Sequence, residues 1–583
     1  MFSSETILDL PASLASRMYK HQKEGVQWLS DLHKNSEYSG GILGDDMGLG
    51  KTFMITSFLT SLIRNQEVQN VLIICPVSVL QSWSRELNEH MVPNKGSANL
   101  RIEVIEAEMG MNRRKKVLSE LFSDMSPSRP HVIVSSYQLV SNMINVFANE
   151  DSANGTGEGN SKRWDWVILD EGHIIKNPNT KLSKSMNYLP SCHRMILTGT
   201  PVQNNLQEFW SLINWCTHGN LLGSRKEFKK KYMEPIVNGR NPHASLIEQR
   251  RSERATNELA NLIRPILLQR KKESVIQSGK QLSSDFTKEN ENSNGYAKMD
   301  VEKNHMSLPS KKEIAIWVPL SDTQRNLYEK FLQSRAVSSV LNSRAAYPVE
   351  LINHLKTLCR HPFLLESGEM SKRRAQVDKI SGEITLEKAF KNMNFRTTLS
   401  QNANVFEVAS RTPSCTELLK GSNKLEVLVS LVKHLRKDKH RILIFSQSKL
   451  QIDLIEKVVE ESGFATVRID GGVKGKQRQV IIDSFNMPVV EEEHSQKKNN
   501  LRAHVCLLST KACCTGITLT GADRVILHDP SWNPASDRQA VDRAYRIGQK
   551  KDVLVYRLLS SGTVEEKIYE KQVFKDGVRV LLE

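Results

Sequence analysis

The stretch GGILGDDMGLGKT, residues 40–52, decides how the rest of this sequence is interpreted, because it has most features of a phosphate-binding loop. Such a loop needs backbone N–H groups at the start of a helix, a lysine that reaches the phosphates and a hydroxyl that binds Mg²⁺. These requirements are met by Gly48, Gly50, Lys51 and Thr52. Apolar residues at helical spacing between positions 53 and 62 predict the helix that should follow. The usual spacing asks for glycine where this chain has Asp45, so a glycine-rich turn before a core helix is the alternative.

An acidic motif downstream favours the nucleotide interpretation. In WVILDEGH, residues 166–173, a run of buried-strand character ends in Asp170 and Glu171. The carboxyl end of a parallel strand is where open α/β sheets bind ligands. We expect Asp170 to hold Mg²⁺ through water and Glu171 to act as general base on the attacking water. An acidic turn that caps a strand is the alternative.

Apolar runs of strand length alternate with helical patterns in two parts of the chain. The runs are residues 71–76, 101–107, 131–137 and 166–171, and then 441–447, 465–471, 504–510, 524–530 and 553–559. Unbroken apolar strands are typical of a parallel sheet that is covered on both faces. The pattern therefore predicts two α/β domains, each with a doubly wound parallel sheet. Polar stretches at 150–163, 277–307, roughly 367–421 and 487–500 indicate a linker and insertions that interrupt no candidate site.

Composition limits the class of protein. A chain of 583 residues is too long for one hydrophobic core. No apolar run approaches the roughly 20 residues of a membrane span, and the N-terminus lacks the layout of a secretory signal. We therefore expect a soluble, intracellular protein without a membrane partner. The eight cysteines include no C-x-x-C pair, which favours buried thiols over a zinc site or disulfides.

Positive charge is concentrated in one segment. The chain has a net charge of +16, and thirteen basic against six acidic residues lie between Arg225 and Glu273. Such an excess suits a polyanionic partner, although solvated surface helices are the alternative. The same clusters are weak candidates for nuclear localisation.

A basic motif near the end, DRQAVDRAYRIGQ at 537–549, suggests a second part of the site. Gln539, Arg543 and Arg546 are spaced four and three apart, which on a helix places them on one face. Arginine suits the charge that develops on a transferring γ-phosphoryl. Because these arginines and the phosphate loop lie in different halves, hydrolysis would need domain closure. Alternatively, the arginines pair with Asp537 and Asp542 on a surface helix.

Further motifs complete a resemblance that runs colinearly from Tyr19 to about Lys575. They are YKHQKEGVQWL (19–29), VLIICPVSVLQSW (71–83), LTGTPVQNNLQEFWSL (197–212), LCRHPFLL (358–365) and LTGADRVILHDPSWNP (519–534). With the loop and DEGH, they resemble the Swi/Snf-type superfamily-two helicase-like ATPases. The tail at 562–576 looks most like the branch containing the Cockayne syndrome group B ATPase and the polo-kinase-interacting checkpoint translocase. In that family an aspartate at the position of Asp45 is normal.

The resemblance implies ATP and Mg²⁺ as cofactors and assigns the site residues. Catalytic roles fall to Lys51, Asp170, Glu171, Arg543 and Arg546, and the metal is held by Thr52 and Asp170. ATP is contacted by Gln22, at the adenine edge, and by Asp45, Asp46, Met47, Gly48, Leu49, Gly50, Lys51, Thr52, Gln539, Arg543 and Arg546. DNA phosphates are contacted by Pro76, Ser78, Ser82, Ser135, Ser136, Tyr137, Ser446, Thr510, Thr515 and Trp532. Small hydroxyls and backbone amides fix register without base readout.

The resemblance also implies an organisation. It comprises an N-terminal extension (1–17), an ATP-binding RecA-like domain (18–272) with a helical protrusion from about 203, a polar linker (273–312), a second RecA-like domain (313–559) with an insertion at about 367–421, and a brace-like segment (560–583). No reader module such as a bromodomain is visible, so we expect a minimal, monomeric motor or a fragment.

The activity implied is a DNA-dependent ATPase that moves along double-stranded DNA in the nucleus, with nucleosomes or other protein–DNA complexes as substrates, in repair or chromosome segregation. A strand-separating helicase is one alternative. The other is a nucleotide-responsive DNA-binding scaffold with little turnover. The scaffold is favoured by one departure, Cys513 and Cys514 where the family has glycines. If those positions need positive φ, each cysteine costs on the order of 1 kcal/mol.

Overall fold

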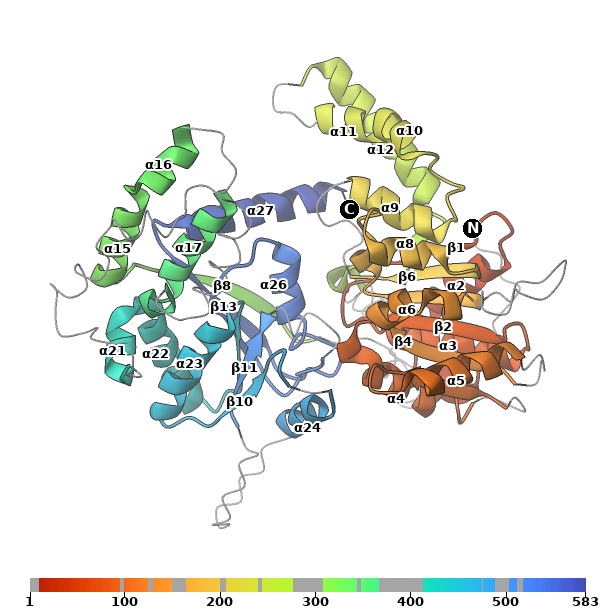
Figure 1. Cartoon of the computed structure of the whole chain (residues 1–583), viewed down its shortest axis with the longest axis horizontal. Coiled ribbons are helices and arrows are strands. Elements are labelled where there is room, and N and C mark those ends of the chain that lie inside the picture. The colour runs from red at the N-terminus through yellow and green to blue at the C-terminus, as the bar shows by residue number, and fades with distance from the viewer. Residues whose placement is uncertain are drawn as a thin grey trace, which may run out of the picture. The chain divides into compact units, whose positions relative to one another are not determined.

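Two α/β units make up the chain, Met1–Leu308 and Pro309–Glu583 (Figure 1). The computed structural model describes residues 10–94, 99–123, 129–148, 164–199, 206–239, 244–275, 308–342, 348–365, 413–473, 475–487, 503–510 and 517–582. Each unit is built on one parallel sheet, so the predicted fold class is confirmed.

The first unit has a seven-stranded sheet in the order β3-β4-β2-β5-β6-β1-β7. Its strands are β1 (Gly40–Leu43), β2 (Asn70–Cys75), β3 (Arg101–Ile105), β4 (His131–Ser136), β5 (Trp164–Asp170), β6 (Ser191–Leu197) and β7 (Leu267–Leu268). All their pairings are parallel. The carboxyl ends of the strands therefore meet at one edge, which is where a ligand site is expected.

Helices cover both faces of this sheet. On one face, α2 (Lys20–Lys34), α3 (Lys51–Arg64) and α4 (Leu80–His90) pack in sequence. The direction of the right-handed crossovers places the remaining helices on the other face. They are α5 (Met111–Ser123), α6 (Tyr137–Asn142), α7 (Ile144–Phe147), α8 (Lys181–Tyr188) and α9 (Leu206–Cys216). The helix predicted after the phosphate loop is α3.

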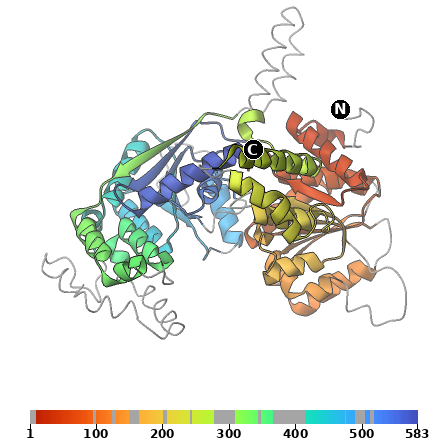
Figure 2. The same cartoon turned by 90° about the horizontal axis from the view of Figure 1, so that it is seen from above.

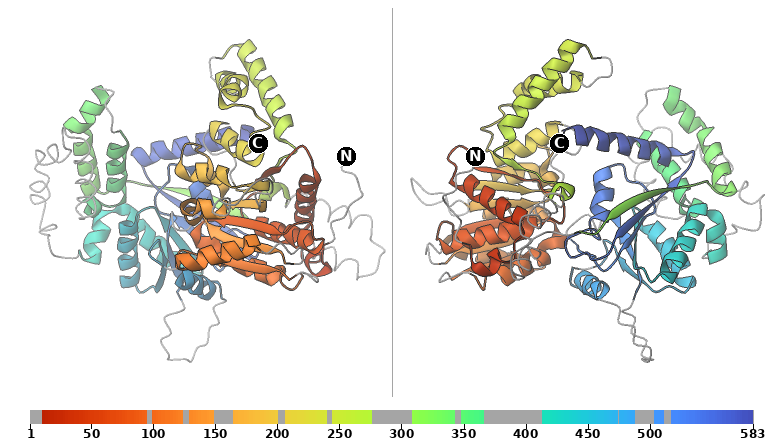
Figure 3. Two further views of the ribbon diagram at one scale, coloured as in Figure 1. Left: turned by 45° about the vertical axis from the view of Figure 1, so that its right-hand side comes forward. Right: turned by 180° about the vertical axis from the view of Figure 1, so that it is seen from behind.

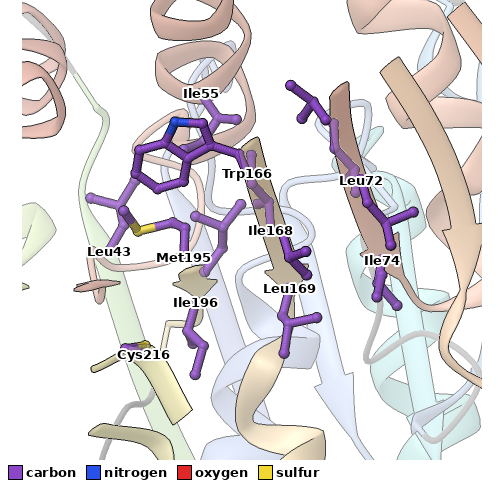
Figure 4. Packing of buried hydrophobic residues seen from close by; sticks show 14 of the residues in the cluster. Leu43, Ile55, Leu72, Ile74, Trp166, Ile168, Leu169, Met195, Ile196 and Cys216 are labelled. Atoms are coloured by element: carbon purple, nitrogen blue, oxygen red, sulfur yellow. The ribbon is translucent and has the colours of Figure 1, made fainter. Parts of the chain in front are cut away.

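The core of the first unit interlocks these layers (Figure 4). The labelled side chains come from β1 (Leu43), β2 (Leu72, Ile74), β5 (Trp166, Ile168, Leu169), β6 (Met195, Ile196), α3 (Ile55) and α9 (Cys216), and each is at most 1% exposed. Because successive strand residues point to opposite faces, neighbours such as Ile168 and Leu169 pack against different helix layers. The strand ends that carry the site are thus attached to a close-packed frame.

A helical protrusion extends away from this sheet in Figure 1, and Figure 2 shows the same yellow-green helices from above. It consists of α10 (Arg225–Phe228), η4 (Lys229–Met233), α11 (Glu234–Gly239) and α12 (Leu246–Ile263). Ser224 and Ser245 begin α10 and α12 with capping boxes. Phe228 and Tyr232 are buried, whereas the basic side chains point to solvent: Lys229, Lys230, Arg250, Arg251 and Arg254 are all exposed.

The second unit has a six-stranded parallel sheet in the order β10-β11-β9-β12-β13-β8. Its strands are β8 (Lys311–Val318), β9 (Ile442–Ser446), β10 (Thr466–Ile469), β11 (Val505–Ser509), β12 (Arg524–Leu527) and β13 (Val553–Ser560). The helices that pack one face are α22 (Asn423–Lys437) and α23 (Lys449–Glu461), and those that pack the other are α24 (Gly475–Asn486) and α26 (Pro534–Val541).

A smaller helical cluster joins the same unit. It contains α15 (Asp322–Leu332), α16 (Arg335–Asn342) and α17 (Pro348–Arg360), followed by η5 (Pro362–Leu365). The last helix, α27 (Val564–Leu582), contacts α17 and α26. Lys424 and Glu565, both almost fully buried, form an ion pair of 2.7 Å that fixes the start of α27 to α22.

Two predicted boundaries differ from the structure. Strand β8 begins at Lys311, inside the predicted linker 273–312, and lies beside β13 (Figure 3). Its first residues are exposed, as on other edge strands, so its apolar signal is weak. Helix α21 (Cys415–Gly421) falls within the predicted insertion 367–421, yet Leu418 is buried in the core against α22 and α23.

The described cysteines are all free. Cys75, Cys216, Cys359 and Cys506 are buried as predicted, whereas Cys192 is exposed. Among the helices in the described ranges, none combines the length and apolar character needed to cross a membrane.

Candidate functional site

The phosphate loop connects β1 to α3 at the carboxyl edge of the first sheet. Gly48 and Gly50 have φ of 86° and 88°, a region in which glycine is favoured. A Cβ at Gly50 would collide with the side-chain amide of Gln22. Gly50 is also the N-cap of α3, and in this part of the chain no side chain caps the helix. The first N–H groups of α3 therefore suit an anion.

Lys51 lies within this loop. Its Nζ donates to the backbone oxygens of Asp45 (2.5 Å) and Asp46 (3.2 Å). Burial lowers the pKa of Lys51, and the carboxylates of Asp45 and Glu171 oppose that shift. A poorly solvated ammonium beside helix N–H groups fits the phosphates of a nucleotide.

Asp170 ends β5 and is held by hydrogen bonds on both carboxylate oxygens. Its Oδ2 accepts from Nε1 of Trp83 at 2.8 Å, and its Oδ1 accepts from the backbone N–H of Glu171 at 3.0 Å. Burial, with the charge of Glu171, raises the pKa of Asp170 to about 6. The hydroxyl of Tyr137 donates to the Asp170 backbone oxygen at 2.8 Å. A desolvated carboxylate next to a second acid suits a hard cation such as Mg²⁺.

Glu171 occupies an uncommon backbone conformation, with φ 53° and ψ 42°. For a residue other than glycine such a conformation costs free energy, and it is found frequently at functional sites. Its Oε2 lies 3.3 Å from Nδ1 of His173, and that nitrogen lies 3.4 Å from the hydroxyl of Thr198 after β6. The expected general base is thus joined to the end of a neighbouring strand.

Helix α2 is fixed to the same loop. Gln22 accepts from the backbone N–H of Tyr19 (3.1 Å) and donates to the backbone oxygen of Leu49 (3.1 Å). Nε2 of His21 lies 3.0 Å from the same oxygen, and burial lowers the pKa of His21. The contact of Gln22 with adenine stays a prediction.

The sequence reasoning missed two residues of this site. Arg270 binds the carboxylate of Asp45, which is fully buried, so the side chain of Asp45 faces an arginine and not solvent. Trp83 binds Asp170. The sequence did contain a signal for Arg270. Asp45 is a charged residue at a position where glycine is usual, and a buried carboxylate needs a partner.

The residues expected to contact DNA in the first unit divide into two groups. Pro76, Ser78 and Ser82 are partly exposed after β2. Ser135, in contrast, is fully buried and donates to the backbone oxygen of Ile105 at 3.0 Å. Ser136 and Tyr137 are also buried. The Ser136 side chain caps α6, and the Tyr137 hydroxyl donates a hydrogen bond to the Asp170 backbone oxygen. The side chains of this second group belong to the core.

In the second unit, Ser446 and Thr510 are buried at the ends of β9 and β11. Trp532 is 42% exposed, and Nζ of Lys356 lies 5.8 Å from its ring centroid. Thr515, Cys513 and Cys514 lie outside the described residues.

The predicted helical face of Gln539, Arg543 and Arg546 is wrong. Helix α26 contains Gln539 but ends at Val541, so both arginines lie in the turns that follow. The backbone oxygen of Arg543 accepts from Leu519 at 2.8 Å and its Nη1 donates to the oxygen of Ile517 at 3.4 Å. These tertiary contacts replace a further helical turn.

One of the two alternative partners of these arginines, Asp537, is engaged elsewhere. Asp537 is buried and binds Arg557 at 2.8 Å. Lys51 and the two arginines belong to different units, so their approach during hydrolysis stays a prediction.

Comparison with known protein families gives two matches. The SNF2-related domain matches residues 21–291 and 294–364, and the helicase conserved C-terminal domain matches residues 423–548. The first match holds the phosphate loop and Asp170, and the second holds Gln539, Arg543 and Arg546.

Curated relatives match along nearly the whole chain. Protein CHROMATIN REMODELING 24 of Arabidopsis thaliana is 35% identical over 582 residues, which are 98% of this chain and 46% of the relative. The human DNA excision repair protein ERCC-6-like is 35% identical over 571 residues, 97% of this chain and 41% of the relative. The human DNA excision repair protein ERCC-6 is 31% identical over 577 residues, which are 97% of this chain and 32% of the relative. The chain thus spans less than half the length of these curated relatives.

One solved structure, titled as a Sulfolobus solfataricus SWI2/SNF2 ATPase core in complex with dsDNA, aligns over 99% of this chain and 94% of its own, at 23% identity and a TM-score of 0.38. The domain matches alone cover more than half of the sequence. They confirm the resemblance drawn from the motifs, and the chain belongs to the SNF2-related family of helicase-like ATPases.

Proposed function

We propose that this chain hydrolyses ATP in a DNA-dependent manner and uses the free energy to move along double-stranded DNA. The observation that carries the proposal is the juxtaposition of an uncapped helix start, Lys51 and the Asp170–Glu171 pair at one edge of one sheet. Family membership supports ATP and Mg²⁺ as cofactors.

The residues of the first unit fit the parts of Mg·ATP. When bound, the nucleotide supplies the γ-phosphoryl group and Mg²⁺ neutralises its charge. Lys51 and the N–H groups of α3 bind the phosphates, while the Thr52 hydroxyl and the Asp170 carboxylate hold the metal. Glu171 orients the attacking water and takes up its proton. Trp83 keeps Asp170 in one orientation.

DNA is the partner that the surface charge supports. The exposed basic side chains of α10 to α12 form a cationic surface on the protrusion, and Pro76, Ser78 and Ser82 lie partly exposed after β2. Such contacts bind the phosphate backbone without reading the bases. We therefore propose binding that depends little on sequence and weakens steeply with salt, with a log–log slope of about −0.9 per neutralised phosphate.

The relatives suggest a setting. Their printed names refer to chromatin remodelling and DNA excision repair. We propose that this chain acts in the nucleus on nucleosomes or other protein–DNA complexes, as a monomeric motor. Its division into an ATP-binding region (18–272), a second RecA-like region (313–559) and a brace-like end (560–583) is part of the same proposal.

The decisive measurement is phosphate release with and without duplex DNA over a range of salt. Stimulation of at least tenfold by DNA of unrelated sequences supports the proposal. Nucleotide binding without DNA-stimulated turnover would instead support a DNA-binding scaffold with little turnover. Replacement of Cys513 and Cys514 by glycine would then be the first change to test. Displacement of a triplex-forming strand without separation of the duplex distinguishes a translocase from a strand-separating helicase.

A further inference from the structure

Arg270 lies two residues beyond β7 and contacts three separate parts of the nucleotide site. Its Nε and Nη2 donate to the two carboxylate oxygens of Asp45, at 3.1 Å and 2.5 Å. Its Nη1 donates to the backbone oxygen of His21 in α2, and Nη2 lies 3.6 Å from the sulfur of Met54 in α3. One guanidinium therefore joins the phosphate loop to the helices before and after it.

The need for this arginine follows from Asp45. Asp45 stands where the general phosphate-loop pattern has glycine, and its side chain is fully buried. A buried carboxylate without a partner is strongly destabilising. The Arg270 side chain is itself only 15% exposed, and its planar fork can bind both oxygens at once, which a lysine cannot do.

The backbone on each side of Arg270 sets the register of the loop. The backbone N–H of Gly44 donates to Leu268 at 2.7 Å and that of Asp46 donates to Arg270 at 3.0 Å. In return, the N–H of Lys272 donates to the carboxylate of Asp46 at 3.0 Å. Residues 44–46, the first part of the loop, are therefore bound by residues more than 220 positions later in the chain.

This arrangement reaches the phosphate-binding lysine through one intermediate. The backbone oxygen of Asp45, whose side chain Arg270 holds, is one of two acceptors for Nζ of Lys51, at 2.5 Å. If the Asp45 side chain lost its contact with Arg270, the backbone oxygen of Asp45 would be less firmly positioned. The hydrogen bond that this oxygen accepts from the Lys51 ammonium would then be weakened.

We infer that Arg270 is a positioning residue of the nucleotide site, which holds the phosphate loop in its binding conformation through Asp45. The inference rests on the proposed function, because it concerns affinity for the same nucleotide. Arg270 acts through Asp45 and makes no contact with the reacting atoms.

The test uses the full chain and the binding of a fluorescent ADP analogue with Mg²⁺. Arg270→Gln is expected to weaken binding at least tenfold. Arg270→Lys keeps the positive charge but loses the forked guanidinium, so it should weaken binding less than Arg270→Gln does. Asp45→Asn should also weaken binding. The double variant Asp45→Asn with Arg270→Gln should lose clearly less than the product of the two single losses, because the pair is removed together.

Arg194 provides a matched control, since it is a buried arginine of the same unit that is not part of the nucleotide site. Its guanidinium donates to the side chain of Ser191 and to the backbone oxygens of Asn187, Leu189 and Trp215. Arg194→Gln should lower the melting temperature as much as Arg270→Gln but leave ADP affinity within twofold of the wild type.

The inference is overturned if Arg270→Gln melts cooperatively and binds ADP within twofold of the wild type. It is equally overturned if Arg194→Gln weakens ADP as much as Arg270→Gln does, since the effect would then be general loss of stability. If Arg270→Gln does not fold, the ADP affinities of Arg270→Lys and of the double variant still test the inference. Failure of the wild type itself to bind nucleotide would refute the proposed function and this inference together, whereas equal binding by wild type and variants refutes this inference alone.

Discussion

The indole N–H of Trp83 donates a hydrogen bond of 2.8 Å to Oδ2 of Asp170. Trp83 is 1% exposed and lies in α4, whereas Asp170 ends β5, so the bond joins two elements 87 positions apart. The partner of a metal-binding carboxylate fixes its orientation and is often nearly as important as the carboxylate itself. The bond therefore predicts that Trp83 has a role through the orientation of Asp170.

Trp83→Phe should raise the Mg²⁺ concentration needed for half-maximal ATP hydrolysis by about tenfold, because the ring is kept and the donor is lost. Mn²⁺ binding in the presence of ADP, followed by electron paramagnetic resonance, should weaken in parallel. The control is Trp215→Phe, which removes an equally buried indole whose N–H donates to the Met186 backbone oxygen at 3.1 Å. Unchanged metal dependence in Trp83→Phe would contradict the role.

Lys51→Ala and Glu171→Gln should both reduce ATP turnover by 100-fold or more but differ in nucleotide affinity. In the proposed mechanism Lys51 supplies positive charge to the phosphates, so its loss should weaken ATP binding at least tenfold. In the same proposal Glu171 acts on water, so Glu171→Gln should bind ATP about as tightly as the wild type. Equilibrium binding of labelled ATP measures the difference, and equal loss of affinity in both variants would refute the role of Glu171.

Arg543→Ala and Arg546→Ala should suppress hydrolysis by about 10³ while ATP and DNA binding persist, if both arginines reach the γ-phosphate when the units close. Arg543 is buried and bonded to Ile517, so its variant should also lower the melting temperature, whereas the half-buried Arg546 should have a smaller effect. Surface ion pairs of these arginines would be worth only about 0.3–0.5 kcal/mol. Steady-state rates within twofold of the wild type in both variants would exclude the cross-unit site.

The surroundings of His361 predict that the stability of the second unit decreases at acid pH. Its Nδ1 accepts from the backbone N–H of Phe363 (3.1 Å) and its Nε2 donates to the Leu418 oxygen (3.0 Å), so the neutral ring satisfies both neighbours. Burial lowers the pKa of His361 to about 4. The folded pKa lies below the unfolded value of about 6.5, so this contribution to stability is complete above pH 6.5 and is lost as pH falls toward 4.

The difference in unfolding free energy between the wild type and His361→Leu should therefore shrink by about 2–3 kcal/mol between pH 7.5 and pH 4.5. Denaturant unfolding at the two pH values, followed in the full chain, measures it. A difference that does not change with pH would show that the ring is not held neutral.

The sequence alone determined the parts of the site that are contiguous in the chain. Gly48, Gly50 and Lys51 lie close together at the start of a helix, and Asp170 and Glu171 lie at the end of a buried strand, so local spacing was enough to predict their place in the fold. The two parallel sheets were predictable for the same reason, because strands buried on both faces are apolar throughout. The motifs were likewise sufficient to recognise the family.

Only the tertiary structure decided which residues support that site. Arg270 is 225 positions from Asp45, and Trp83 is 87 positions from Asp170, so no local pattern joins either pair. Tertiary contacts also ended α26 at Val541, where helical spacing predicted that it would continue to Arg546. Periodicity reports what a segment favours by itself, whereas a buried charge or an unpaired carbonyl takes its partner from whichever segment the fold brings within hydrogen-bonding distance.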